Sequence, residues 1–528
     1  MSNAAPDTVA TADMPVTHGI DAVGHIESRG IDYIPPAERH GKSSSLFWVW
    51  MSANVIYLYF VLGGVLILLG LPVWQALMLT VLGNLWWIAV GWLAISGPGS
   101  GTPSVVIMRT MFGARGNKLF GEALGVLIGI FYEILNVTFA TLASVALLQH
   151  IGIDVSPGVE WGVLAVVTVL SFGISVYGHG TILKLSPIFT AALVVCFILL
   201  AVFVFGAADF SYTPPAMSSG ENWALLLLGF AIMASGPLSW GTSADYARYL
   251  PKNVSRRAVV LWTALGGLIP AVLISALGVI AGTAIDMTDP QVAIAKIVPG
   301  WFYPVFLAMI VLGSITNNVL CAYSTGLYVQ ALGLRIHRAW TVVICGVVVA
   351  AASAYLLFAT PSFLDTLNAA IELSVAVLAP QIAIYAVDVF VRRNRYDGIA
   401  LNDETRNSPF WHSGGWYWPG VIAMSVSVAV AMLMVNTTLY EGPIAVALGG
   451  ADISPIVAPL LAGSLYALLW YTTEPYRTPA NRPVDTDVDT DVDTDIHVGT
   501  DAQTDADVAA LAAPVAVEAE ALLEEVTA

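Results

Sequence analysis

The stretch LFWVWMSANVIYLYFVLGGVLILLG, residues 46–70, is apolar throughout except for the short interruption Ser52-Ala53-Asn54. It exceeds the roughly 20 residues that a helix needs to cross the hydrocarbon core of a bilayer. Backbone that leaves the helical path inside a membrane is tolerated only where it lines a cavity or is buried in protein. The stretch therefore predicts a membrane-spanning helix interrupted at a functional position. A kink with small packing residues is the alternative.

Apolar runs of similar length follow along the chain. Because 57% of the residues are hydrophobic and only 11% are charged, a soluble domain has no way to bury these runs. We predict an all-α polytopic membrane protein with twelve transmembrane helices, at residues 46–70, 73–96, 119–149, 161–177, 185–206, 222–247, 258–283, 302–330, 339–358, 363–390, 417–436 and 454–472.

The basic residues are distributed on one side of these spans. Of the 20 Lys and Arg residues, all except Lys296 fall in the N-terminal segment, the C-terminal segment or every second loop. Cationic loops resist translocation and stay cytoplasmic. The pattern predicts a multi-pass protein of the cytoplasmic membrane with both termini inside.

Composition divides the chain into three parts: a cytoplasmic N-terminal segment (1–45), a twelve-helix transporter domain (46–473) and an acidic tail (474–528). The tail repeats Asp-Thr-Asp-Val and is expected to be disordered in the cytoplasm, because dense like charge opposes folding. The net charge of −17 comes mostly from the two ends, so it carries no information about the substrate.

Several function classes are disfavoured by missing motifs. The sequence has no phosphate-binding loop, no nucleophile elbow and no His/Cys cluster with ligand spacing. We therefore expect no enzyme, no bound cofactor or metal, no nucleic-acid binding and no obligatory protein partner. The expected partners are the lipid bilayer and a small-molecule substrate.

A second interruption, Ser235-Gly236-Pro237, lies within the run 222–247. It follows the first interruption by five helices, so the two helices run in opposite directions through the membrane. Interrupted helices at matching positions of two inverted halves are typical of a transporter's substrate site.

Three further polar positions fall deep inside apolar runs. Glu133 lies near the middle of helix 119–149, with Asn136 one turn further on, and a carboxyl at that depth is functional by default. Burial favours the neutral carboxyl, which suits a proton carrier, although a structural carboxyl is the alternative. Thr316, Asn317 and Asn318 lie at the middle of helix 302–330, where they line a site or bond neighbouring helices.

Two acidic residues near helix ends have a basic residue one turn later. Asp245 precedes Arg248 by three residues, and Asp388 precedes Arg392 by four. Intrahelical ion pairs are the expected arrangement. Among the aromatic residues, Trp240 adjoins the second interruption, so it is a candidate to stack on a flat heterocycle.

Five segments together resemble the nucleobase–cation symporter-1 family, in particular its purine–cytosine permeases. Their order and spacing along the chain make the resemblance fairly specific, over about Ser43 to Tyr476. The segments are WVWMSANVIYLYFVLGG (48–64), GNLWWIAVGWLAISGPGSGTPSVVIMRTMFGARGN (83–117), GTSADYARYLP (241–251), ITNNVLCAYSTGL (315–327) and APQIAIYAVDVFVRRNRY (379–396).

The resemblance implies two inverted five-helix repeats of the LeuT-like, APC-type fold and import of a small heterocycle by alternating access. In the family the base lies between helices 1, 3, 6 and 8. The positions that resemble its hydrogen-bonding residues are Glu133 and Asn318. We expect Asn136, Ser235, the backbone around Gly236 and Trp240 to complete the substrate site.

The resemblance also addresses the coupling ion. Sodium-coupled members use helix 1 carbonyl groups and two helix 8 hydroxyls, and the pair that resembles these hydroxyls is Thr316 and Asn317. One hydroxyl is thus an amide, which with Glu133 nearby favours protons over sodium. The expected ion-coupling residues are Asn54, Glu133, Thr316 and Asn317.

The substrate stays open among cytosine, purines, allantoin, hydantoins and vitamin-like rings. A passive channel and a membrane receptor or scaffold are the alternatives from other functional classes. The paired helix interruptions disfavour the channel, and only the acidic tail supports the receptor.

Overall fold

The computed structural model describes residues 23–334, 336–359, 363–437 and 440–473. The predicted N-terminal segment 1–45 is described only from residue 23, and the predicted tail 474–528 lies outside the described residues. The described chain is helical, with two isolated β-bridges as its only extended pairings. The helices are α1 (Ser45–Asn54), α2 (Tyr57–Leu68), α3 (Val73–Asn84), α4 (Trp86–Ala94), α5 (Ser96–Ser100), α6 (Ser104–Ile107), α7 (Arg109–Asn117), α8 (Leu124–His150), α9 (Pro157–Tyr177), α10 (His179–Ala207), α11 (Ser219–Leu238), α12 (Ala244–Ala247), α13 (Arg256–Gly282), α14 (Pro290–Ala293), α15 (Tyr303–Ala331), α16 (Arg338–Ala359), α17 (Phe363–Val391), α18 (Trp418–Met434), α19 (Pro443–Ala447) and α20 (Ser454–Thr472).

Ten of the described helical segments are long and apolar enough to cross a membrane, and the bent pair α1–α2 makes an eleventh. The remaining predicted span corresponds to α18, which has 17 residues and falls below the length of a candidate span. The all-α membrane architecture is therefore confirmed, whereas the count of twelve stays a prediction.

The first predicted interruption is a real break in the helix. The axes of α1 and α2 differ by 56°, and the backbone is extended at Ile56 (φ −130°, ψ 152°). The break falls at Val55 and Ile56, directly after Ser52-Ala53-Asn54. The polar residues therefore form the last turn before the break.

The second break lies further along the chain than expected. Ser235, Gly236 and Pro237 belong to the last turn of α11, which continues to Leu238, and the non-helical segment follows at residues 239–243. The Gly236 carbonyl accepts hydrogen bonds from the Ser239 backbone and hydroxyl. A proline inside a helix loosens the turn that precedes it, yet the Ser239 N–H also donates to the Ser235 carbonyl oxygen. The prediction that the backbone at Gly236 is unwound is wrong by about three residues.

Close backbone approach joins the first broken helix to α13. A Cβ atom added to Gly278 of α13 would lie 1.9 Å from the Phe60 carbonyl oxygen of α2, so only glycine allows this contact. Small residues at such crossings are a common way for membrane helices to pack.

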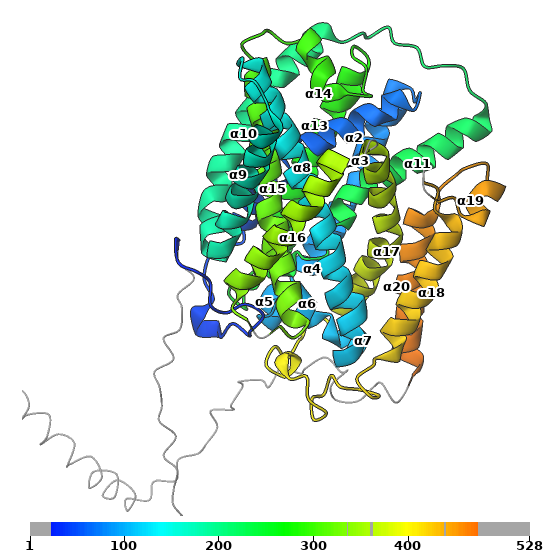
Figure 1. Ribbon diagram of the computed structural model, residues 1–528. Helices are drawn as coiled ribbons and strands as arrows, with labels where there is room; N and C mark the ends of the chain where they lie inside the picture. Colours follow the sequence, from blue (N-terminus) through cyan, green and yellow to red (C-terminus); the bar gives the residue numbers. More distant parts are fainter. Residues whose placement is uncertain (1–22, 335, 360–362, 438–439, 474–528) are drawn as a thin grey trace, which may run out of the picture. The chain divides into compact units, whose positions relative to one another are not determined.

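The other long helices form two groups beside this unit (Figure 1). α8 packs along α15, and α9 and α16 cover them. α18 and α20 pack against each other and against α17, which places the last two helices together at one edge (Figure 1). Large apolar side chains on α10, including Val202 at 64% exposure and Phe205 at 54%, face outward, as contact with lipid requires.

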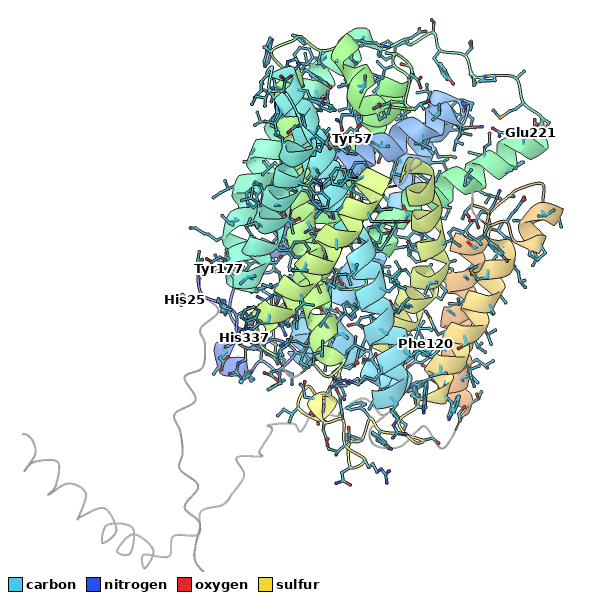
Figure 2. The ribbon with its side chains drawn as sticks, in the orientation of Figure 1. His25, Tyr57, Phe120, Tyr177, Glu221 and His337 are labelled. Atoms are coloured by element: carbon cyan, nitrogen blue, oxygen red, sulfur yellow. The ribbon has the colours of Figure 1, made fainter. Side chains whose placement is uncertain are left out.

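Loops that the charge pattern placed on one side do lie together. Arg39 donates to the Pro98 carbonyl oxygen, and Lys118 forms an ion pair with Glu404 at 3.1 Å. His25 and His337 also lie at this end of the helices, opposite Glu221 (Figure 2). Because the N-terminal segment of the chain lies here, we refer to this end of the whole helix bundle as the N-terminal end.

The expected intrahelical ion pairs divide into one that forms and one that does not. The Arg392 Nε donates to the Asp388 carboxylate at 2.8 Å, as predicted. The Asp245 carboxylate instead accepts from the Ser104 backbone N–H, and Arg248 binds Glu27. The prediction of an Asp245–Arg248 pair was wrong because each group has a partner from a distant part of the chain: the first N–H of α6 for Asp245 and the Glu27 carboxylate for Arg248.

Candidate functional site

One cavity lies between the two helix breaks. The elements around it are the α1–α2 break, α8, the α11–α12 break, α15 and α17. Each break contributes backbone groups that no helix satisfies, which is the usual reason for unwinding a helix beside a ligand. The polar and aromatic residues that line it include Asn54, Tyr57, Tyr59, Tyr132, Asn136, Ser235, Gly236, Ser239, Trp240, Thr242, Ser314, Asn317, Cys321, Ser324, Thr325 and Gln381.

The lining follows one stripe on each of the two central helices. On α8 the stripe contains Tyr132 and Asn136, and on α15 it contains Asn317 and Cys321. Residues four apart share a helix face, whereas each successive residue is rotated by about 100°. Tyr132, Asn136 and Cys321 therefore reach the cavity together.

Three predicted site residues do not line this cavity. Glu133, Thr316 and Asn318 are buried but fall outside its lining. Glu133 and Asn318 directly adjoin lining residues in sequence, and one residue of rotation turns them toward other helices. That these two residues hold the heterocycle stays a prediction; the amides that face this cavity are those of Asn136 and Asn317.

Asn136 and Asn317 connect α8 and α15 to the first helix break. The Asn136 amide donates to the Asn317 Oδ1 at 2.8 Å. The Asn317 amide in turn donates to the Ala53 carbonyl oxygen at 2.7 Å, in the last turn of α1. A carbonyl at a helix end has no intrahelical donor, so Asn317 supplies the missing one.

Asn54 bridges the break itself. Its amide donates to the Trp50 carbonyl in α1, and its Oδ1 accepts from the Tyr59 hydroxyl in α2. A Cβ atom added to Gly236 would lie 2.5 Å from that hydroxyl, so Tyr59 packs directly on α11. The predicted residues Asn54 and Gly236 thus meet through Tyr59, which the sequence did not single out.

Trp240 is held in place by an aromatic cluster. Its ring lies edge-on to the Trp50 ring, with centroids 5.2 Å apart, and Trp50 also contacts Trp87 and Tyr246. Edge-to-face contacts of this kind add about 0.5–1.5 kcal/mol each beyond burial. The cluster therefore holds the Trp240 ring in one orientation at the wall of the cavity.

The cavity offers both unused donors and unused acceptors. Within the described part of the chain, the backbone N–H groups of Gly241 and Thr242 find no backbone acceptor, and the Thr242 hydroxyl has no partner. Asn136 and Gln381 donate through their amide nitrogens to protein acceptors, which leaves their side-chain oxygens available. Such a set binds a ring with adjacent N–H and C=O or ring-nitrogen groups.

The sequence matches a family model described as permease for cytosine/purines, uracil, thiamine, allantoin, over residues 33–458. The chain belongs to this family. The resemblance to nucleobase–cation symporter-1 proteins is thereby confirmed, and the chain is a multi-pass membrane transporter and not an enzyme.

Curated relatives cover most of the chain at low identity. The Bacillus subtilis (strain 168) protein YxlA, which carries the name of a purine–cytosine permease, is 25% identical over 466 residues, covering 84% of this chain and 96% of the relative. The purine–cytosine permease FcyB of Emericella nidulans is 26% identical over 462 residues, covering 81% and 85%. The vitamin B6 transporter TPN1 of Saccharomyces cerevisiae is 24% identical over 362 residues, covering 62% and 60%.

Solved structures show the same fold. The nucleobase–cation symporter-1 transporter Mhp1, in a closed conformation with bromovinylhydantoin bound, matches with a TM-score of 0.67 at 18% identity, over 86% of this chain and 97% of its own. Its inward-facing conformation matches with a TM-score of 0.63 at 16% identity, over 87% and 97%. The expected LeuT-like architecture is thus the fold of this chain.

Proposed function

We propose that this transporter imports a planar heterocycle of the nucleobase class, bound in the cavity between the two helix breaks. The observation that carries this proposal is the combination of a preset aromatic ring, Trp240, with unused backbone donors at Gly241 and Thr242 and amide oxygens at Asn136 and Gln381. A nucleobase presents alternating donors and acceptors on one edge and an aromatic face. The names of the purine–cytosine permeases among its relatives support the same class.

We further propose that uptake is coupled to protons rather than sodium. Sodium binding at the end of α1 would need free carbonyl and hydroxyl oxygens, because hard cations take oxygen ligands. The Asn317 amide instead donates a hydrogen bond to the Ala53 carbonyl oxygen at the end of α1. An N–H donor in this place opposes a cation, which supports coupling to protons.

The N-terminal end of the helices is proposed to face the cytoplasm. It gathers Arg39, Lys118, Arg248 and Arg338, whose charges resist translocation. In this orientation the substrate enters from the end that carries Glu221.

Uptake into proteoliposomes tests the proposed function. Purified protein is reconstituted, and accumulation of radiolabelled cytosine, adenine and uracil is measured with an inward proton gradient, an inward sodium gradient or neither. Unlabelled hydantoin, allantoin and pyridoxine serve as competitors. We expect accumulation of at least one nucleobase with the proton gradient alone. Equal flux without accumulation would indicate a channel, and binding without flux a receptor; either result contradicts the proposal.

Cys321 provides an independent test of the cavity. Its thiol lines the cavity beside Asn317, whereas Cys196 and Cys345 lie outside it. We expect a small methanethiosulfonate reagent to inhibit uptake and the transported nucleobase to protect against it. At ten times its dissociation constant the nucleobase should slow inhibition by about tenfold, since it leaves roughly a tenth of the sites free. The Cys321→Ser variant should be insensitive; inhibition that the nucleobase does not slow would exclude this cavity.

A further inference from the structure

Glu133 is buried at the middle of α8, outside the cavity described above. Its side chain is fully inaccessible, and within the described part of the chain neither carboxyl oxygen has a hydrogen-bond partner. An ionised carboxylate in this condition is strongly disfavoured, because it loses its hydration and gains no donor in return. The carboxyl is therefore neutral in the arrangement that the structure shows.

Apolar residues flank Glu133 on α8 and pack against α15. Val137, one turn further along α8, packs with Ala322 of α15 in a buried cluster. Asn318 of α15 is also buried, and neither its Oδ1 nor its Nδ2 has a partner among the described residues. The contacts of Asn136 with Asn317 and of Gly129 with Thr325 show that α8 and α15 run antiparallel, which brings Thr325 rather than Asn318 to the Glu133 carboxyl.

Few titratable groups of the described residues face Glu133. Cys321 of α15 and Cys345 of α16 lie within its electrostatic reach. α9, the third helix packed against α8, carries its ionisable residues Glu160 and Tyr177 only in its end turns. The nearest residues of opposite charge along the chain belong to the turn that contains Lys118, roughly 20 Å away along the helix axis. A buried structural ion pair is therefore not the role of this carboxyl.

Thr325 connects this carboxyl to the cavity. Its side chain lines the cavity and also approaches the Glu133 carboxyl, while its hydroxyl donates to the Cys321 carbonyl oxygen. Gly129, one turn before Glu133, also lines the cavity, and a Cβ atom there would lie 2.1 Å from the Thr325 hydroxyl. One hydroxyl thus separates Glu133 from the space that the substrate occupies.

We propose that Glu133 is a proton-binding site separate from the heterocycle site and loaded from the cavity past Thr325. This inference rests on the proposed proton-coupled uptake. Protonation transfers one proton from water in the cavity to a carboxylate oxygen, forming an O–H bond and leaving hydroxide to be neutralised by the solvent. The neutral carboxyl permits the close packing of α8 on α15; the anion requires water to enter, which separates the two helices.

The two sites communicate through α15. Asn317 bonds the α1 end and the cavity amide Asn136, and Thr325, two turns further along the same helix, approaches the Glu133 carboxyl. A shift of α15 that hydrates Glu133 therefore also moves the residue that holds the first helix break. Proton binding at Glu133 thereby changes the position of Asn317 in the substrate cavity, although the proton and the substrate do not touch.

The test separates proton-driven accumulation from exchange. Proteoliposomes with wild-type protein or Glu133→Gln receive radiolabelled cytosine, or adenine or uracil where the uptake screen identifies it. With a pH difference of one unit, one-proton coupling predicts about tenfold accumulation in the wild type. Glu133→Gln, a mimic of the neutral carboxyl, should abolish accumulation and retain counterflow exchange of the same nucleobase.

The possible results distinguish failure of the Glu133 proposal from failure of the proposed nucleobase import. Glu160→Gln, a carboxyl change in the first turn of α9, is the matched control and should behave like the wild type. Accumulation by Glu133→Gln at wild-type level would overturn the inference, as would loss of both accumulation and exchange when the protein still binds the nucleobase in a thermal-shift assay. Absence of uptake and exchange in the wild type would instead overturn the proposed function.

A second variant tests the route past Thr325. Thr325→Val keeps the shape but removes the hydroxyl, so the rate of proton-driven uptake should fall about tenfold or more while exchange persists. Thr325→Ser should restore the rate. Equal rates for the valine and serine variants would contradict this route.

Discussion

Replacing Asn317 by alanine is expected to reduce the initial rate of nucleobase uptake by about tenfold to a hundredfold. The variant loses the donor to the Ala53 carbonyl and the acceptor for the Asn136 amide. A buried polar group left without a partner costs about 1–3 kcal/mol, and the Ala53 carbonyl lies where the first helix break meets the cavity. The Asn136 amide keeps its bond to the Tyr132 carbonyl. The measurement is initial uptake of the nucleobase by proteoliposomes, with its binding measured in parallel.

Ser314 provides the matched control for this variant. It lines the cavity one turn before Asn317 on the same helix, so Ser314→Ala removes a polar group from the same face without breaking the link to α1. It should retain most of the uptake. A double-mutant cycle between Asn136 and Asn317 should give a coupling energy of about 0.5–3 kcal/mol, as expected for residues in direct contact. Additive effects would show that the bond has no role in transport.

Replacing Glu27 by alanine should strongly destabilise the protein and open its N-terminal end. The Glu27 carboxylate is 4% exposed and accepts from Arg248 at 2.5 Å, from the Tyr249 hydroxyl at 2.8 Å and from the Tyr323 hydroxyl at 3.2 Å. It thereby joins the N-terminal segment to the end of α12 and to α15. Removing one partner of a buried ion pair costs about 3–5 kcal/mol, because the remaining charge is left without compensation.

The expected readouts are a lower thermal unfolding temperature and faster labelling of Cys321 by a thiol reagent applied at the N-terminal end. Glu38→Ala is the control, because Glu38 pairs with Arg29 in the same segment but is 26% exposed. Exposed ion pairs contribute about 0–1 kcal/mol, so this variant should resemble the wild type. Similar effects of the two substitutions would argue against a specific closure by Glu27.

The sequence predicted the helix breaks well at one site and less well at the other. At the first break, polar residues interrupt an apolar run, and the break follows them directly at Val55. At the second, Gly236 and Pro237 indicate a break, but the helix continues to Leu238. Propensity identifies where a helix is weak. The position at which it ends depends on the contacts of the segment beyond it, here the Trp240 ring on Trp50.

For the polar residues of α8 and α15, the sequence predicted the depth in the membrane but not the direction in which each side chain points. The sequence placed Glu133, Asn136, Asn317 and Asn318 at similar depth, because depth follows from the position within an apolar run. It did not determine that Asn136 and Asn317 face the cavity while Glu133 and Asn318 face the packed side.

The amino-acid sequence by itself determined the helical membrane architecture, the family and the presence of two interrupted helices. Its Lys and Arg residues also determined which loops lie together on one side. These features depend on hydrophobicity and on local backbone preference, which act over a few residues along the chain. The tertiary structure alone decided which face of each helix lines the cavity and that Glu27, rather than Asp245, binds Arg248. Adjacent helical residues point about 100° apart, so only the packing of helices distant in sequence assigns each side chain its surroundings.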